Sequence, residues 1–63
     1  MNKIKELRSR MGLTVRELSK KSGVASSYIS TLENDTDGTS NPTKEVMIKI
    51  AKALDSSVPK VFF

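Results

Sequence analysis

A run of short hydrogen-bonding side chains between residues 25 and 34 is the most informative chemical feature of this sequence. If the segment ASSYISTLEN is helical, its outward positions hold only serine, threonine and asparagine: Ser26, Ser27, Ser30, Thr31 and Asn34. These residue types are mediocre helix formers because they compete for backbone hydrogen bonds. A face selected only for helix stability would be richer in Ala, Glu, Lys and Gln. The pattern therefore indicates that something other than helix propensity selected these residues, although taken alone the serines could also be inert surface residues.

Catalytic and metal-binding chemistry find little support among the residue types present. The 63 residues include no Cys and no His, so the chain offers no disulfide and no imidazole base or ligand. Its serines lack a histidine base, and its carboxylates are scattered rather than paired. A chain this short buries only about 60% of the surface that it exposes when unfolded, which disfavours a deep pocket. We predict a non-enzyme with no cofactor, no metal and no small-molecule substrate.

The charge of the chain favours an anionic partner, although the cations are unevenly placed. Eleven Lys and Arg outnumber seven Asp and Glu, for a formal net charge of +4. The sequence pI is about 9.7, above the rough threshold of 9 that suggests a nucleic-acid partner. Seven of the cations lie in the first third, whereas residues 22–43 contain none and hold the acids Glu33, Asp35 and Asp37. The middle of the chain therefore supplies no cationic contact.

Apolar spacing predicts two helices in the first third of the chain. The first spans residues 2–11 and is ended by Gly12, with one buried stripe: Ile4, Leu7 and Met11. The second starts at Thr14, which can form a capping box with Glu17. It continues for about two turns to Ser22 and Gly23 and directs two residues inward, Val15 and Leu18.

Two further helices and a closing turn or helix are predicted in the rest of the single domain, residues 1–63. The third helix covers residues 25–34 and the fourth residues 43–54, with an exposed loop of turn-forming residues between them. The expected inward residues of these two helices are Ala25, Ile29, Leu32, Met47, Ile50, Ala51 and Leu54. Val46 and Ile48 both fall near the boundary of the buried side of the fourth helix, and exposure of Ile48 is left open. Ser57 can cap the last segment, which seals the core with Val58, Val61 and Phe62.

Two short helices joined by a tight turn containing Gly make a helix-turn-helix unit, here residues 14–34. Its second helix fits the roughly 12 Å major groove of DNA, where small side chains let the helix backbone approach the base edges. We expect base contacts from Ser26 and Ser27 at the helix N-terminus and from Ser30 and Thr31 one turn deeper. Thr31 also carries a methyl group that could touch thymine. Asn34 is a weaker candidate, and base discrimination should be modest.

Phosphate contacts are expected where the second helix begins, because free N–H groups and the helix dipole attract an anion there. Thr14, the Val15 amide and Arg16 would grip one strand, with charge added by Lys20 or Arg10. Tyr28 flanks the buried stripe and more often packs half-buried than it stacks on a base, although its hydroxyl could reach a phosphate.

The order and spacing of these features resemble the Cro and lambda-repressor-like (Xre) helix-turn-helix domains, over nearly the whole chain. The matching positions are Gly12-Leu13-Thr14, Glu17-Leu18, Gly23-Val24, Ile29, Leu32-Glu33, Asn41-Pro42, Ile50-Ala51 and Ala53-Leu54. The resemblance implies an all-α domain of five short helices, no cofactor, and a recognition helix that begins near Ser26. It also implies backbone contacts by Thr14 and Val15, groove-facing positions at Ser26, Ser27 and Thr31, and a structural ion pair between Arg8 and Glu33.

The chain departs from the family pattern in two places. Groove-facing positions that other members often fill with Gln, Arg or Asn hold Ser and Thr here. Eight residues separate Glu33 from Pro42, and acids stand where relatives often carry cations. Because acids repel phosphate, loop contacts are instead expected from amides and hydroxyls: Gly38, Thr39, Ser40 or Asn41.

The sequence therefore predicts a cytoplasmic repressor-type transcriptional regulator that binds double-stranded DNA. A homodimer would place two recognition helices about 34 to 36 Å apart. Its contacts would come from an apolar patch of Ile48, Val61, Phe62 and Phe63, or from a C-terminal region missing from this chain. The alternative is a protein-interaction module, such as an antitoxin or adaptor, which the acidic loop and apolar tail would suit. Binding to a membrane surface is a third hypothesis, but the apolar stripes fit a globular core better.

Overall fold

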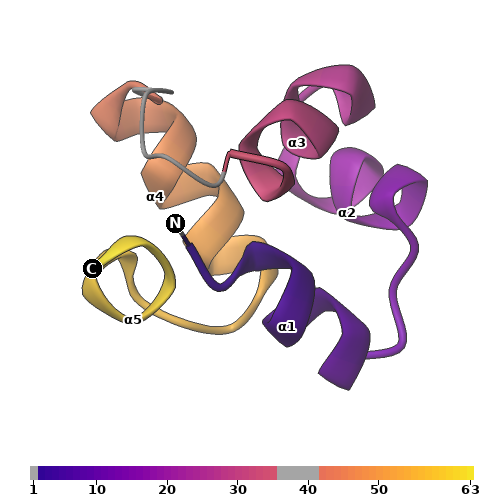
Figure 1. Cartoon of the computed structure of the whole chain (residues 1–63), viewed down its shortest axis with the longest axis horizontal. Helices are drawn as coiled ribbons and strands as arrows, with labels where there is room; N and C mark the ends of the chain where they lie inside the picture. Colours follow the sequence, from indigo (N-terminus) through magenta and orange to yellow (C-terminus); the bar gives the residue numbers. More distant parts are fainter. Residues whose placement is uncertain (1, 36–41) are drawn as a thin grey trace.

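The computed structural model describes residues 2–35 and 42–63, which fold into five α-helices (Figure 1). These are α1 (Ile4–Arg10), α2 (Val15–Ser22), α3 (Ser26–Glu33), α4 (Lys44–Ala53) and α5 (Val58–Phe62). The described residues contain no strand, so the predicted all-α fold class is confirmed, and the predicted helix bounds hold to within two residues. Over the same ranges, no helix combines the length and the apolar character that crossing a bilayer would require.

Capping side chains and a left-handed glycine set the helix ends. The predicted capping box is present: Thr14 Oγ1 accepts the Glu17 N–H at 3.1 Å, and the Glu17 carboxylate accepts the Thr14 N–H at 2.9 Å. Thr43 and Ser57 each accept one N–H from the first turn of α4 and α5, at 3.2 and 3.4 Å. α2 ends at Gly23, whose φ of +77° lies in the region that residues with a Cβ rarely adopt.

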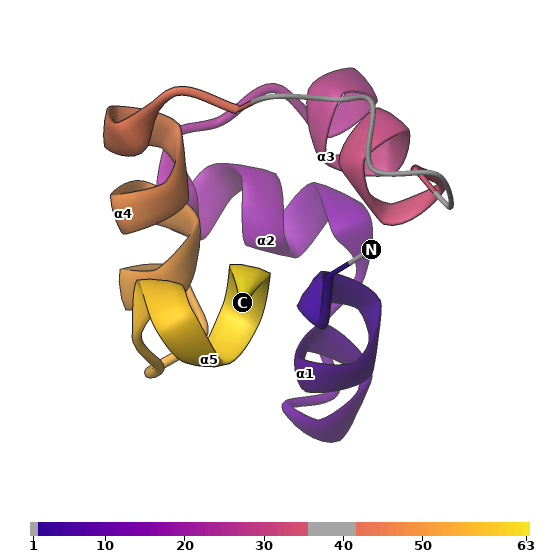
Figure 2. The ribbon, with the colours of Figure 1, turned by 60° about the vertical axis from the view of Figure 1, so that its left-hand side comes forward.

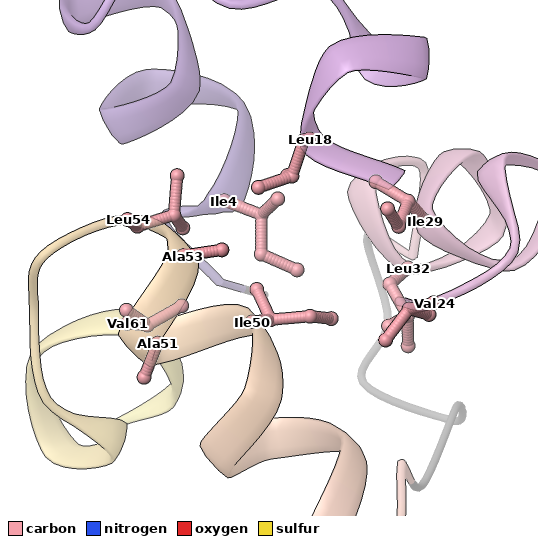
Figure 3. Close-up of a cluster of buried hydrophobic side chains, with 10 residues drawn as sticks. All are labelled: Ile4, Leu18, Val24, Ile29, Leu32, Ile50, Ala51, Ala53, Leu54 and Val61. Carbon is pink, nitrogen blue, oxygen red and sulfur yellow. The ribbon is translucent and has the colours of Figure 1, made fainter. Parts of the chain in front are cut away.

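The core draws on all five helices and on the turn between α2 and α3 (Figure 3). Its buried residues are Ile4, Leu18, Val24, Ile29, Leu32, Ile50, Ala51, Ala53, Leu54 and Val61. α2 packs against both α3 and α4, and it lies at the centre of the view in Figure 2. Because α3 turns Ile29 and Leu32 toward this core, its opposite face is left at the surface.

The observed core differs from the predicted pattern at five positions. Met11 is 36% exposed because α1 ends at Arg10 and the chain turns through Gly12, so Met11 does not complete the stripe. Ala25 is exposed because it precedes the first turn of α3, and Val24 in the turn occupies the core position instead. Met47 is only half-buried, whereas Ala53, which was not expected inside, is buried.

The last helix closes the core as the sequence predicts. Val61 is buried, and Val58 and Phe62 pack against the core while half-buried. Val61 therefore cannot belong to an outer apolar patch, and that part of the predicted dimer surface is wrong. Ile48, at 37%, and Phe63, at 89%, are the members of that patch that are exposed.

The N-terminal segment connects α1 with α3 and α5. The Asn2 side chain donates from Nδ2 to the Leu32 carbonyl oxygen at 2.8 Å, and its Oδ1 accepts the Ile4 N–H at 3.1 Å. The N–H of Lys3 donates to the Val61 carbonyl oxygen at 2.8 Å. These bonds hold the C-terminal end of α3 against the start of α1.

Candidate nucleic-acid interface

The turn between α2 and α3 comprises residues 23–25, and hydrogen bonds from α2 fix its conformation. The Ser19 hydroxyl donates to the Val24 carbonyl oxygen at 2.6 Å, and the Ser22 hydroxyl accepts the Val24 N–H at 3.2 Å. The Gly23 N–H donates to the Ser19 carbonyl oxygen at 2.8 Å. With the Val24 side chain buried as well, the turn holds α2 and α3 in one relative orientation. This is the two-helix unit that the sequence predicts.

The outer face of α3 carries the side chains expected to contact bases. Ser26, Ser27, Thr31 and Asn34 are exposed, whereas Ser30 is half-buried and lies at the edge of this face. Among the described residues, no side chain caps the start of α3. The first turn of α3 therefore presents short hydroxyl groups next to N–H groups that no cap occupies.

The start of α2 offers hydrogen-bond donors for an anion. The capping box uses the oxygen of Thr14 to accept the Glu17 N–H, and the Thr14 side chain also hydrogen-bonds the Glu17 carboxylate. The box does not use the N–H groups of Val15 and Arg16, which belong to the same turn. Thr14 and Arg16 are exposed, while the Val15 side chain packs against the core. Amide and guanidinium donors thus meet at one helix end, beside the Thr14 hydroxyl.

Glu17 places a negative charge at this same helix end. Hydrogen bonds with the Thr14 backbone and side chain, helped by the nearby charge of Lys20, lower the pKa of Glu17 below its ordinary value. The carboxylate is therefore ionised at neutral pH. It serves the cap, and Lys20 partly balances its charge.

The exposed cations predicted to contact phosphate lie on two helices, α1 and α2. Arg16 and Lys20 lie four residues apart on α2 and therefore share a face of that helix. Arg10 lies on α1, where its guanidinium is 3.8 Å from the carboxylate of Glu6. Such an exposed pair contributes little to stability, so Arg10 remains available to an anion.

The Arg8 guanidinium connects α1, the segment before α2, and α3. It donates from Nε and Nη2 to the two carboxylate oxygens of Glu33, at 2.8 and 3.0 Å. Its Nη1 donates to the Leu13 carbonyl oxygen at 2.8 Å. The hydrogen bond to Glu33 raises the pKa of Arg8 above its ordinary value, against the opposing effect of burial. The ion pair expected from the family pattern is present, and it compensates the negative charge of Glu33 on α3.

The remaining residues predicted to contact DNA lie outside the exposed face of α3 or at its end. Tyr28 is half-buried and packs on the core, which is the structural role that the sequence favours. Asn34 is the exposed residue after the last turn of α3. The predicted loop contacts lie outside the described residues: Gly38, Thr39, Ser40 and Asn41.

Sequence reasoning did not single out two side chains that hold the ends of α3 in place, Ser19 and Asn2. Ser19 fixes the turn before α3, and Asn2 holds the carbonyl at its other end. A hydroxyl one turn before a helix-ending glycine is a signal that could have pointed to Ser19. The bond from Asn2 spans 30 residues, and no local pattern indicates it.

The five helices and the exposed face of α3 define a small helix-turn-helix domain. The family model described as Helix-turn-helix matches residues 4–61. The chain therefore belongs to the helix-turn-helix family, in the Cro-like group that its sequence resembles.

Curated relatives and a solved structure agree with this assignment. The chain is similar to the HTH-type transcriptional regulator SinR of Bacillus subtilis (strain 168) and to that of Bacillus licheniformis. Each is 38% identical over 56 residues, which are 89% of this chain and 49% of the relative. The chain thus spans about half the length of the curated relatives it matches. It also resembles the solution structure of the N-terminal DNA-binding domain of the master biofilm regulator SinR from Bacillus subtilis. That similarity has a TM-score of 0.79 and 36% identity, and it covers 92% of this chain and 81% of that one.

Proposed function

We propose that this chain binds double-stranded DNA with sequence preference. It acts as the DNA-binding domain of a repressor-type transcriptional regulator in the cytoplasm. The observation that carries the proposal is the exposed polar face of α3, which hydrogen bonds in the preceding turn hold in place. The fold that presents this face resembles a solved DNA-binding domain with a TM-score of 0.79. The function is binding rather than catalysis. The alternative of an antitoxin or adaptor is not favoured, because the relatives are named as transcriptional regulators.

α3 enters the major groove and contacts base edges with its outer face. Ser26 and Ser27 occupy the first turn, where recognition helices of this kind approach the bases most closely. Thr31 lies on the next turn of the same exposed face. Ser30 contributes less, because it is half-buried at the edge of that face.

Phosphate contacts flank the groove and supply most of the affinity. At the start of α2, the Thr14 hydroxyl, the Val15 N–H and the Arg16 guanidinium bind one phosphate group. Lys20 and Arg10 add positive charge. The Tyr28 hydroxyl, Asn34 and the loop residue Ser40 complete the set of phosphate contacts that we propose.

Two copies act together on the DNA, so that two recognition helices enter successive major grooves. The contact between copies is made by the exposed apolar residues Ile48 and Phe63 with half-buried Phe62, or by a region that follows this chain in a longer protein.

Selection from a random duplex pool at two salt concentrations tests the proposal directly. The enriched duplex is then titrated against a scrambled duplex of the same composition. We expect the enriched sequence to bind at least about 10³-fold more tightly than the scrambled one. A two-fold symmetric enriched site supports the dimer, and a single half-site contradicts it. Equal, salt-sensitive binding to all sequences would contradict sequence-specific recognition.

A further inference from the structure

The hydroxyl group of Thr31 is already engaged within α3. Its Oγ1 donates to the carbonyl oxygen of Ser27, one turn earlier, at 3.0 Å. A hydroxyl has one hydrogen, so in this conformation the Thr31 oxygen can accept from a ligand but has no hydrogen to donate. The methyl group is the other branch on Cβ, and it remains for contact with whatever approaches this exposed residue.

The surroundings of Thr31 raise the importance of that methyl group. Residues 22–43 contain no Lys or Arg, so α3 has no side chain that can make the bidentate contact that selects guanine. The other exposed side chains in its first two turns, Ser26 and Ser27, are short hydroxyl groups that can donate to or accept from either kind of base. Since Asn34 lies after the last turn of the helix, Thr31 therefore has the most selective chemistry among the exposed residues within α3 itself. Its apolar counterpart in the major groove is the C5-methyl group of thymine.

We propose that Thr31 is a specificity-determining residue that recognises a thymine through contact between two methyl groups, with its hydroxyl serving only the helix. This inference rests on the proposed function, because it takes α3 to lie in the major groove. The inference adds one feature to the preferred DNA sequence, which is a 5-methylpyrimidine opposite the second turn of α3.

Uracil substitution tests this contact, since it removes only the C5-methyl group. Each thymine of the selected duplex is replaced in turn by uracil, and the dissociation constant is measured for the whole 63-residue chain. We expect one position per half-site at which uracil weakens binding about fourfold, the worth of one buried methyl group. Two matched variants separate the branches of the side chain: Thr31→Ser removes the methyl group, and Thr31→Val removes the hydroxyl.

The expected result is that Thr31→Val keeps the sensitivity to uracil and Thr31→Ser loses it, each measured as the ratio of that variant's dissociation constants for the uracil duplex and the thymine duplex. Retained sensitivity in Thr31→Ser, or its loss only in Thr31→Val, overturns the inference in favour of the hydroxyl. A site that is enriched but insensitive to uracil at every position overturns this inference alone. If the random pool yields no preferred sequence, the proposed function fails and the inference fails with it.

Discussion

Arg8 on α1 holds Glu33 on α3 by two nearly parallel hydrogen bonds, of 2.8 and 3.0 Å, and both side chains are largely buried. A paired guanidinium and carboxylate fix both distance and direction, because each oxygen meets its own N–H group. The third bond of Arg8, to the Leu13 carbonyl oxygen, adds the segment that leads into α2. One side chain thus ties the recognition helix to α1 and to the start of α2.

Replacing Arg8 by Met should destabilise the fold by about 2 to 4 kcal/mol, because the Glu33 carboxylate is left buried without a partner. This is a large share of the stability expected for 63 residues, roughly 3 to 9 kcal/mol. Urea denaturation followed by circular dichroism measures the loss.

The double substitution Arg8→Met with Glu33→Leu should recover much of the stability, because it removes the unpaired charge as well. Arg10→Ala is the matched control, since its exposed pair with Glu6 should contribute less than about 1 kcal/mol. Equal losses for Arg8→Met and Arg10→Ala would contradict a structural role for the buried pair.

Stability should fall as the pH is lowered through the titration of Glu17. The pKa of Glu17 is lower in the folded chain than its ordinary value, because the ionised carboxylate accepts the Thr14 hydrogen bond. Its contribution is therefore complete above the pKa of the unfolded chain and is lost as the pH falls through the folded value. Thermal unfolding measured from about pH 6 to pH 3 should show this decline, which sets in near the unfolded pKa of about 4.3.

Glu17→Gln separates this effect from general acid denaturation. Glutamine can still accept the Thr14 N–H and complete a capping box, but it does not titrate. The variant should lose less stability than the parent chain over the same pH range. Parallel curves for the two proteins would show that the capping box does not carry the pH dependence.

The helices themselves were predictable because local signals at their ends agree with the apolar spacing. The Thr14 and Glu17 pair fixes the start of α2, and Gly23 fixes its end. The wrong predictions at Met11 and Ala25 both fall at helix ends. There the chain is no longer helical, so a helical-wheel projection does not give the direction of the side chain. Only the packed structure shows that Val24 occupies the position expected for Ala25.

The outward face of α3 could be predicted because its apolar stripe at Ile29 and Leu32 defines the opposite side. The groups that orient this helix could not be predicted from local spacing. The bond from Asn2 to Leu32 depends on how α1 packs against α3. The ion pair between Arg8 and Glu33 was expected from the family resemblance, and no apolar periodicity indicated it. The engagement of the Thr31 hydroxyl is a choice between two allowed rotamers, which the sequence alone does not settle.

Ser27→Glu should abolish the preference for the selected DNA sequence while leaving the fold intact. Ser27 is exposed in the first turn of α3, where a negative charge interacts favourably with the helix dipole. In the groove the same carboxylate is bulky and repels phosphate, so binding to the selected site should fall to the level of scrambled DNA. Competition titrations measure the ratio, and Lys60→Ala is a control with the same change in net charge on α5. Equal losses on selected and scrambled DNA would count against direct recognition by this face.

Arg16→Ala should weaken binding to every DNA sequence by a similar factor, because a phosphate contact carries no base information. The guanidinium is exposed at the start of α2, beside the Thr14 hydroxyl and the Val15 N–H that we assign to the same phosphate. Loss of one such contact should reduce the slope of log K against log salt by about one. Lys60→Ala, which removes an equal charge away from α2 and α3, should leave that slope nearly unchanged. Affinities measured at four or more salt concentrations on selected and scrambled duplexes provide both quantities. If the two variants change the slope equally, net charge governs the salt dependence, and Arg16 makes no specific phosphate contact.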